Sequence, residues 1–247
     1  MRRVAALLAG LSLVCASLTA CGKGGVLVVG VRVGYPGLVV RLPENGYTGF
    51  DIAVARYVAR ELGYSLGQIA YTGDLAGADM VVGTTDAPDA AGPYLVTGSD
   101  LLVRARDLSI AGPKDLRRRR VCGTVADAAP LVRRFGPAWK AAFLAEANVP
   151  AACAPLLAKG TIDAIVADAP VLVGLDAQYP GRFRLCGRSI AVHRYGIGVR
   201  TGGTREEIDA ALRRMFDDGS WNRAVIRYLG VLAARYTSPP PLDVSAR

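Results

Sequence analysis

Histidine and closely spaced cysteines are scarce in this sequence. The chain of 247 residues contains one histidine, His193, and no CxxC motif. Transition-metal sites need clustered imidazole or thiolate ligands, so no metal centre is expected. A lone histidine is more often a surface or packing residue than a catalyst, and His193 is interpreted in that way. The chain also lacks a histidine pair, a nucleophile motif and a glycine-rich phosphate loop. These absences disfavour an enzyme, and no cofactor is expected.

The sequence has no hydrophobic run long enough for a comfortable transmembrane helix, which needs about 20 apolar residues. Residues 4–18 are uncharged and apolar, and they follow Arg2 and Arg3, as in a signal peptide. The segment Leu18-Thr19-Ala20-Cys21-Gly22 resembles a lipobox. It predicts a lipoprotein signal peptide over residues 1–20, lipid on Cys21, and a short tether over residues 21–25. The alternative is an ordinary signal peptide with a cysteine nearby.

Positive charge is abundant but dispersed. The formal charge is +9, and removal of Arg2 and Arg3 leaves 9 − 2 = +7. The one dense run, Arg117 to Arg120, has no interleaved aromatic residues. It is interpreted as a solvated surface turn, and no nucleic-acid partner is expected.

Three cysteines remain after Cys15 leaves with the signal peptide and Cys21 takes lipid. They are Cys122, Cys153 and Cys186. Disulfides persist in exported proteins, so one bond and one spare thiol are expected. The spacing alone does not choose the pair.

Strands and helices alternate along the chain. Residues 46–64 predict an amphipathic helix with Phe50, Val54, Val58 and Leu62 on one face. Thr48 is the expected N-cap. Strands are expected at 26–33, 65–71, 79–82, 95–104, 120–125, 161–166, 182–186 and 195–200. Further helices are expected at 126–136, 138–147, 155–159 and 169–178, from Thr204 with a capping box to Glu207, and at 220–229.

This alternation predicts an α/β fold with mostly parallel sheets. Ligands of such sheets bind at the carboxyl ends of the strands. The expected ligand-bearing loops are therefore residues 34–37, 83–88, 125–129 and 167–170.

The stretch GYTGFDIAVARYVARELG, residues 46–63, resembles the first helix of the family 3 bacterial extracellular solute-binding proteins, the polar amino-acid receptors of ABC importers. Segments at 92–103, 115–121, 160–168, 195–200 and 218–221 resemble later motifs of the family, in the same order. The resemblance implies a two-lobe, type II periplasmic-binding-protein-like fold with a hinge of two crossing strands. Lobe 1 would comprise residues 26–103 and 193–236, lobe 2 residues 104–192, and residues 237–247 a disordered tail.

The resemblance also implies a ligand site between the lobes and a Cys122–Cys153 disulfide. An amino acid needs hydrogen-bond donors for its carboxylate and a carboxylate for its ammonium group. Asp168 matches the ammonium-binding aspartate of the family, with an N-cap of the following helix as the alternative role. The full set of candidate ligand-binding residues is Tyr35, Thr84, Thr85, Thr97, Asp127 and Asp168.

The sequence departs from the family at the rim of this site. The arginine that binds the ligand carboxylate in the family is missing from residues 83–89, while Asp86 and Asp127 add negative charge. Arg104 or Arg106 is a possible replacement, and a cationic ligand, or none, is an alternative to an ordinary amino acid.

The leading hypothesis is a monomeric, membrane-anchored, extracytoplasmic receptor that passes a small polar solute, nominally glutamate or glutamine, to an ABC permease. The alternative is a binding-degenerate lipoprotein of the same fold that acts as a sensor or protein-partner module. An enzyme on the same scaffold is disfavoured.

Overall fold

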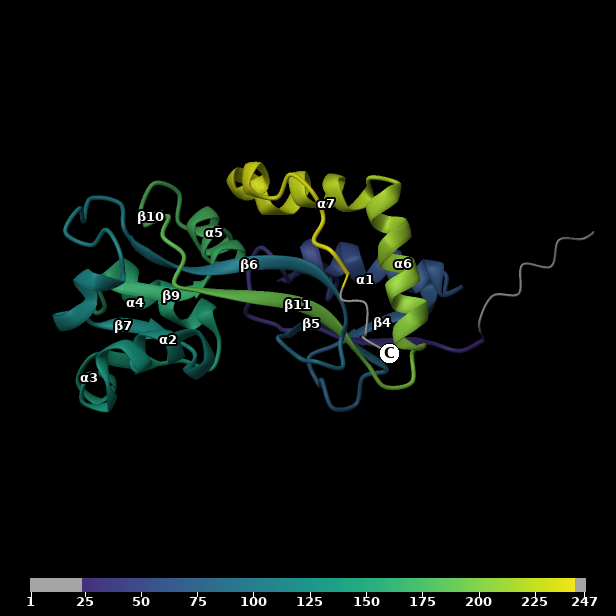
Figure 1. Ribbon diagram of the computed structural model, residues 1–247, viewed down its shortest axis with the longest axis horizontal. Coiled ribbons are helices and arrows are strands. Elements are labelled where there is room, and N and C mark those ends of the chain that lie inside the picture. The colour runs from purple at the N-terminus through teal and green to yellow at the C-terminus, as the bar shows by residue number, and fades with distance from the viewer. Residues whose placement is uncertain (1–23, 243–247) are drawn as a thin grey trace, which may run out of the picture.

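The computed structural model describes residues 24–242 and is elongated, with long strands joining its two halves (Figure 1). The strands are β1 (Leu27–Gly30), β2 (Val40–Arg41), β3 (Tyr47–Thr48), β4 (Ile69–Thr72), β5 (Met80–Thr85), β6 (Ala91–Arg104), β7 (Val121–Gly123), β8 (Leu144–Glu146), β9 (Ala164–Asp168), β10 (Phe183–Leu185) and β11 (Ala191–Val199). The α-helices are α1 (Phe50–Glu61), α2 (Val125–Phe135), α3 (Pro137–Phe143), α4 (Ala154–Lys159), α5 (Ala169–Gln178), α6 (Arg205–Asp217) and α7 (Ser220–Leu229). The predicted signal peptide and Cys21 lie outside the described residues.

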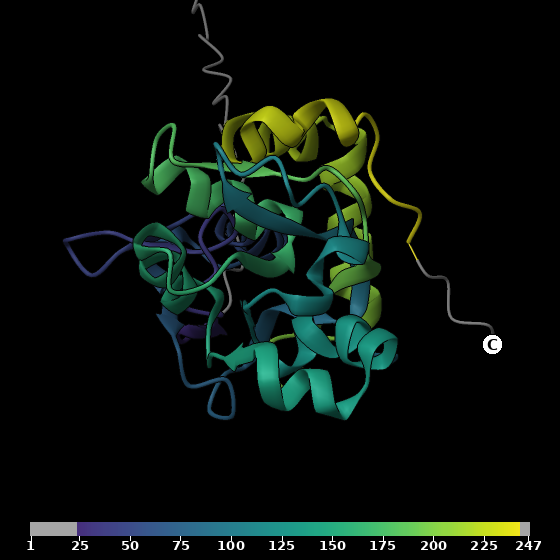
Figure 2. The same ribbon diagram turned by 90° about the vertical axis from the view of Figure 1, so that its left-hand side faces the viewer.

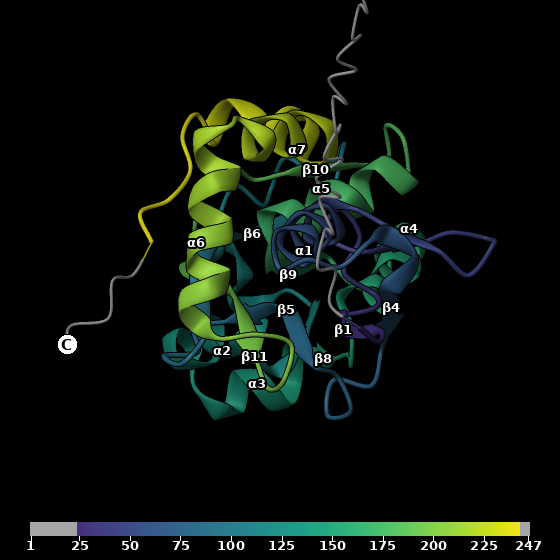
Figure 3. The same cartoon turned by 90° about the vertical axis from the view of Figure 1, so that its right-hand side faces the viewer.

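Each half of the molecule is built on three parallel strands. In lobe 1, β1 pairs in parallel with β4 and β5, and α1, α6 and α7 belong to this half (Figure 3). In lobe 2, β7 pairs in parallel with β8 and β9. Figure 2 views the molecule from the lobe 2 end, with that lobe's teal helices nearest the viewer. The expected parallel sheets are therefore present within each lobe.

Two long antiparallel strands, β6 and β11, connect the lobes. They pair from Ala191 with Ser99 to Ile197 with Ala91. β11 also pairs with β5 of lobe 1, while β6 also pairs with β9 of lobe 2. The sheet as a whole is therefore mixed, and these strands form the hinge expected from the sequence. The lobe boundaries proposed above remain a prediction.

Helix α1 has the expected buried face but a different N-terminus. Phe50, Val54 and Val58 are completely buried. The N-cap is Gly49, and no side chain caps this end. A Cβ at Gly49 would lie 2.2 Å from the carbonyl oxygen of Leu38, so the close approach of the backbone requires glycine. The predicted cap at Thr48 is wrong, because Thr48 pairs with Val40 in the β2–β3 hairpin, which the sequence did not predict.

Lobe 2 differs from the prediction after α3. The helix expected over residues 138–147 ends at Phe143, and Leu144–Glu146 form β8 instead. Leu144 pairs with Val121 of β7. Sheet pairing to a buried strand outweighs the helical propensity of this segment, which depends on tertiary context.

A disulfide joins Cys122 to Cys153, as the resemblance implied. Both residues are buried. Cys186 is a free thiol with intermediate exposure. No helix within residues 24–242 is long and apolar enough to cross a membrane. Residues 237–242 form no helix or strand, although Leu242 packs against the core.

Reduction of this disulfide is expected to lower the free energy of unfolding by about 4 kcal/mol, because the bond closes a loop of 31 residues in the unfolded chain. Urea denaturation with and without dithiothreitol measures this difference. The Cys186→Ser variant should lose as much stability on reduction as the parent protein. Equal unfolding midpoints in the two conditions would contradict the expectation.

The two lobes touch through the turn that follows β1. The carbonyl oxygen of Gly34 accepts a hydrogen bond from Ala151 N of lobe 2 at 3.3 Å. A Cβ at Gly37 would lie 2.4 Å from the carbonyl oxygen of Pro170, and one at Gly174 would lie 2.3 Å from Pro36 C. Backbone therefore packs directly on backbone across the junction, and the lobes are closed against each other here.

Candidate ligand-binding site between the lobes

Asp168 lies at the carboxyl end of β9 and is 4% exposed. Its Oδ1 accepts a hydrogen bond from Ser99 Oγ at 2.9 Å and lies 2.8 Å from His193 Nδ1. Its Oδ2 accepts from Tyr195 Oη at 2.5 Å. Asp168 is the N-cap residue of α5, but its side chain makes no capping bond. Asp168 therefore occupies the N-cap position that the alternative expected, but its carboxylate binds the hinge strands and does not cap the helix.

The electrostatics of Asp168 and His193 favour an ion pair. Burial works to raise the pKa of Asp168, but the hydrogen bonds from His193, Tyr195 and Ser99 outweigh it and lower the pKa. The hydrogen bond to Asp168 raises the pKa of His193 above its ordinary value, against the effect of burial. His193 is therefore a site residue that the sequence argument passed over. Its place on a hinge strand became visible only in the fold.

Asp127 and Thr124 lie at the N-terminus of α2 in lobe 2. Thr124 Oγ1 donates to Asp127 Oδ2 at 2.6 Å and accepts from Asp127 N at 3.1 Å. Burial is the main cause that raises the pKa of Asp127, and the nearby charge of Asp168 adds to it. Residues 126–128, in the predicted ligand loop 125–129, have no hydroxyl side chain, and Thr124 provides one just before them.

Arg32 is a cation at the site that the sequence analysis missed. It follows β1 by two residues, and its guanidinium carbon lies 3.9 Å from the centre of the Tyr35 ring. Its Nη1 donates to the carbonyl oxygen of Gly83 at 3.3 Å. Burial works to lower the pKa of Arg32, but interactions with Tyr35, Tyr195 and Asp127 raise it. The sequence feature that could have identified Arg32 is its position just before the predicted ligand loop 34–37.

Neither arginine proposed as a replacement clamp is available. Arg104 donates to the carbonyl oxygen of Ile162 at 2.6 Å and to Asp163 Oδ1 at 3.1 Å. These contacts hold it on lobe 2, at the end of β6. Arg106 is exposed on the loop that follows.

The three threonines of the predicted site have different surroundings. Thr85 pairs with Tyr195 across β5 and β11, so the two side chains project from the same face of the sheet. Thr84 points from the other face and donates to the carbonyl oxygen of Val81 at 3.2 Å. Thr97 is buried, and its hydroxyl lies 2.7 Å from Tyr236 Oη. Thr85 is therefore the one of the three placed beside Tyr195.

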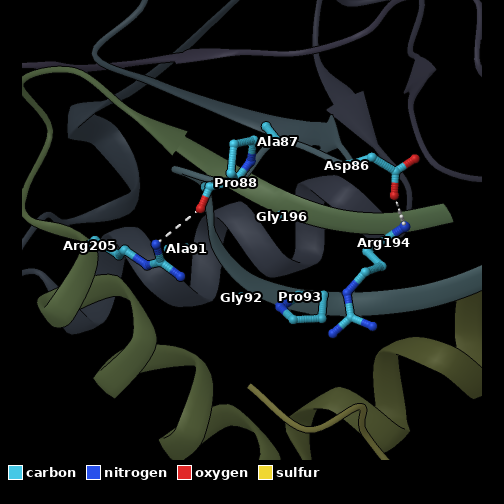
Figure 4. Close-up of a pocket in the computed structure, with 10 residues that line it drawn as sticks. Asp86, Ala87, Pro88, Ala91, Gly92, Pro93, Arg194, Gly196 and Arg205 are labelled. Atoms are coloured by element: carbon cyan, nitrogen blue, oxygen red, sulfur yellow. Dashed lines mark hydrogen bonds between the residues drawn. The ribbon is translucent and has the colours of Figure 1, made fainter. Parts of the chain in front are cut away.

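Asp86 was expected to add repulsion at the rim, but it is tied to its own lobe. Its Oδ1 accepts a hydrogen bond from Arg194 N at 2.9 Å (Figure 4). It lines a surface pocket of about 240 Å³ beside the β5–β6 loop, where Arg205 donates to the carbonyl oxygen of Pro88 at 3.1 Å. The carboxylate of Asp86 is thus held within lobe 1 by a backbone N–H group.

Asp51 is a buried carboxylate of lobe 1 near Arg32. It is 1% exposed, and its Oδ1 accepts a hydrogen bond from Tyr94 Oη at 2.8 Å. Burial raises the pKa of Asp51 to about 6, while the hydrogen bond from Tyr94 and the charge of Arg32 work to lower it. The side chain therefore changes protonation state in mildly acidic solution.

Asp51→Asn is expected to remove a pH-dependent loss of stability. Between the ordinary pKa of 3.8 and about 6, the folded chain keeps a proton that the unfolded chain releases. Stability therefore falls as the pH rises through this window, by about 3 kcal/mol. The variant should gain about that much relative to the parent between pH 4 and pH 7, measured by urea denaturation. Asp89→Asn, at an exposed residue, is the control. Parallel pH profiles of D51N and the parent would contradict the prediction.

Comparisons with known proteins address the relatives and the fold of the chain. No family model matches the chain. It is 28% identical to the glutamate-binding protein GluB of Corynebacterium glutamicum over 287 aligned positions, which cover 98% of this chain and 96% of that protein. The identity to glutamate-binding protein GluB of Corynebacterium efficiens is also 28%, over 98% of this chain and 94% of that protein.

Solved structures show the same fold. An ancestral arginine-binding protein bound to arginine has a TM-score of 0.72 at 23% identity, covering 83% of this chain and 99% of that chain. A putative binding component of an ABC transporter from Wolinella succinogenes, complexed with lysine, has a TM-score of 0.71 at 21% identity, covering 84% of this chain and 97% of that chain.

The chain has the two-lobe fold of the type II periplasmic binding proteins. Within that class, the chain-length similarity to two glutamate-binding proteins confirms the resemblance to the family 3 extracellular solute-binding proteins. Both of these relatives bear the names of binding proteins and not of enzymes.

Proposed function

We propose that this chain is a receptor that binds a small polar amino acid, nominally glutamate, between its lobes. The observation that carries the proposal is the electrostatic interaction of Arg32 from lobe 1 with Asp127 from lobe 2, which in turn lies near the charge of Asp168. An α-amino acid presents a carboxylate and an ammonium group a few ångströms apart, so it matches such a pairing of charges. The names of the two glutamate-binding relatives support glutamate as the first ligand to test.

The ligand carboxylate is assigned to Arg32 and the N-terminus of α2. A guanidinium binds a carboxylate with two parallel hydrogen bonds. Helix α2 has 11 residues, and the free N–H groups and dipole of its first turn favour an anion. The hydroxyl of Thr124 lies at the same helix end, but it donates its proton to Asp127 Oδ2, so Arg32 and the remaining free N–H groups are the donors assigned to the ligand. These groups supply what the missing rim arginine provides in the family.

The ligand ammonium group is assigned to Asp127 and Asp168. Removal of water on closure strengthens these charge interactions, because the local dielectric constant falls. Tyr35 covers one side of Arg32 and holds the guanidinium plane. Thr85, beside Tyr195, is a further hydroxyl at the junction.

The receptor is proposed to serve an ABC importer, as an extracytoplasmic monomer anchored to the membrane through lipid on Cys21. The lipobox-like segment at residues 18–22 and the short linker to β1 support the anchor. The family resemblance supports an ABC permease as the partner. Mass spectrometry of the membrane fraction tests the anchor, because an unmodified mature N-terminus would contradict it.

A binding-degenerate sensor or partner module is the second candidate. The observation in its favour is that Asp168 already receives hydrogen bonds or an ion pair from Ser99, His193 and Tyr195. Few hydrogen-bonding positions on the Asp168 carboxylate therefore remain for the ammonium group of a ligand.

Isothermal titration of residues 22–247 with glutamate, glutamine, aspartate and arginine tests the proposal. Tight binding of an acidic or polar amino acid is the expected result, with a dissociation constant of about 1 μM and injection heats that fall to baseline as one site saturates. Folded protein that binds none of the four would contradict the receptor function and favour the second candidate.

A further inference from the structure

A groove lined by arginines runs between α1 and α7 on lobe 1, away from the ligand site. These two helices lie side by side (Figures 1 and 3). The groove has a volume of about 430 Å³. Its basic residues are Arg56 and Arg60 from α1 and Arg223 and Arg227 from α7. Each pair is four residues apart, so both guanidinium groups of a pair lie on one face of their helix.

The charges of these four exposed arginines are not balanced by ion pairs. No salt bridge joins any of them to a carboxylate in the part of the chain that the structure describes. Their hydrogen bonds go to uncharged groups, as when Arg56 donates to the carbonyl oxygen of Tyr47 and Arg223 donates to Ser220 Oγ.

The acidic residues near the groove are already engaged. The carboxylate of Asp218 accepts from Tyr57 Oη at 2.8 Å and from Ser220 N at 2.7 Å. Glu61 pairs with Arg214 at 2.6 Å. Asp218 stays charged and offsets part of the charge of Arg223, but the four arginines outnumber it, so the groove carries a net positive charge. Tyrosine rings lie beside Arg60 and Arg227.

Exposed aliphatic side chains accompany this charge. Leu66 lines the groove and is 68% exposed, and Val26, at the start of the described chain, is 59% exposed. Arginine beside exposed aliphatic side chains is the composition of a membrane-surface contact, where the cations meet phosphates and the apolar groups meet acyl chains.

The chain leaves lobe 1 close to this groove. Gln68 Nε2 donates to the carbonyl oxygen of Gly25 at 3.0 Å. Gln68 belongs to the same 3₁₀ turn as Leu66, which lines the groove, so Gly25 lies near the groove. Cys21 precedes Gly25 by four residues, which span at most about 14 Å when extended. A lipid on Cys21 therefore keeps the groove within reach of the membrane surface.

We propose that the groove between α1 and α7 binds the headgroups of anionic phospholipids and so orients the anchored protein on the membrane. This inference rests on the proposed anchor at Cys21 but uses residues outside the amino-acid site. A basic residue near an anionic membrane contributes about a fivefold increase in partitioning, which corresponds to about 1 kcal/mol. Four arginines together account for a factor of several hundred.

Vesicle co-sedimentation of residues 22–247, which lack the anchor, tests the groove directly. Vesicles contain either phosphatidylcholine alone or phosphatidylcholine with 30% phosphatidylglycerol. We expect binding only to the anionic vesicles, with loss of binding at high salt because the charges are screened. The quadruple variant R56Q/R60Q/R223Q/R227Q should partition at least 100-fold more weakly.

A matched variant removes the same charge from lobe 2. R117Q/R118Q/R120Q/R133Q changes four exposed arginines far from the groove and should keep partitioning within about threefold of the parent. Equal losses in the two variants would overturn the proposal, because net charge alone would then explain binding. Equally strong binding of the parent to duplex DNA would also overturn it, by indicating an unselective polyanion site.

Titration with the amino-acid panel separates this proposal from the receptor function. Both quadruple variants should bind the ligand as the parent does, and circular dichroism confirms that they are folded. Protein that binds an amino acid but no vesicle contradicts the lipid groove alone. Protein that binds anionic vesicles but no amino acid contradicts the receptor function alone.

Discussion

Arg32→Gln is expected to weaken amino-acid binding about 100-fold. The substitution removes the cation that faces Asp127 from the opposite lobe, and a charged hydrogen bond in a buried site contributes about 1.5–3 kcal/mol. Arg32→Lys should recover little of this affinity, because a lysine lacks the planar fork that binds both oxygens of a carboxylate. Isothermal titration with the ligand identified for the parent measures both losses.

Arg104→Gln is the matched control for this experiment. Arg104 is also partly buried and hydrogen-bonded, but its contacts to Ile162 and Asp163 hold it within lobe 2. We expect the control to keep the ligand affinity of the parent. If R32Q kept its affinity and R104Q lost it, the result would contradict the assignment to Arg32. It would indicate that Arg104 binds the ligand carboxylate, as the sequence first suggested.

Gly174→Ala is expected to prevent closure of the lobes while leaving each lobe folded. A Cβ at Gly174 would lie 2.3 Å from Pro36 C and 2.4 Å from Gly37 N. Backbone atoms cannot move aside as a flexible side chain does, so the lobes must separate. Within α5, alanine is favoured over glycine by about 1 kcal/mol, so lobe 2 should not lose stability. Ligand affinity should fall at least 100-fold.

Small-angle X-ray scattering distinguishes this effect from unfolding. With ligand bound, the parent should have the radius of gyration of the closed structure, whereas G174A should keep a larger one with or without ligand. Gly67→Ala is the control, because a Cβ there meets nothing within 4 Å. A G174A protein that closes and binds like the parent would contradict the direct contact between the lobes.

Local sequence signals were enough to predict several elements. Helix α5 spans Ala169–Gln178 as expected, since an apolar stretch follows a buried strand. The capping box at the start of α6 is present, with Thr204 Oγ1 accepting from Glu207 N at 3.2 Å and Glu207 Oε2 accepting from Thr204 N at 2.8 Å. These features depend on residues that are neighbours in sequence, so a short window contains all the interactions that fix them.

The candidate site was only partly predictable, because its residues are far apart in the sequence. The sequence pointed to the strand ends that bear Tyr35, Asp127 and Asp168, because α/β sheets place ligands there. It gave no weight to Arg32 or His193, since neither belongs to a local motif.

The sequence by itself determined the alternation of strands and helices, the buried face of α1 and the cysteines available for a disulfide. Tertiary structure alone decided which charges meet. His193 reaches Asp168 because β6 lies between β11 and β9, so that three strands distant in the chain become neighbours in one sheet. Arg32 interacts electrostatically with Asp127 of the other lobe, and Gly34, Gly37 and Gly174 allow the two backbones to touch at this junction. Such contacts depend on the closure of long loops and on close packing between lobes, which no local pattern of residues encodes.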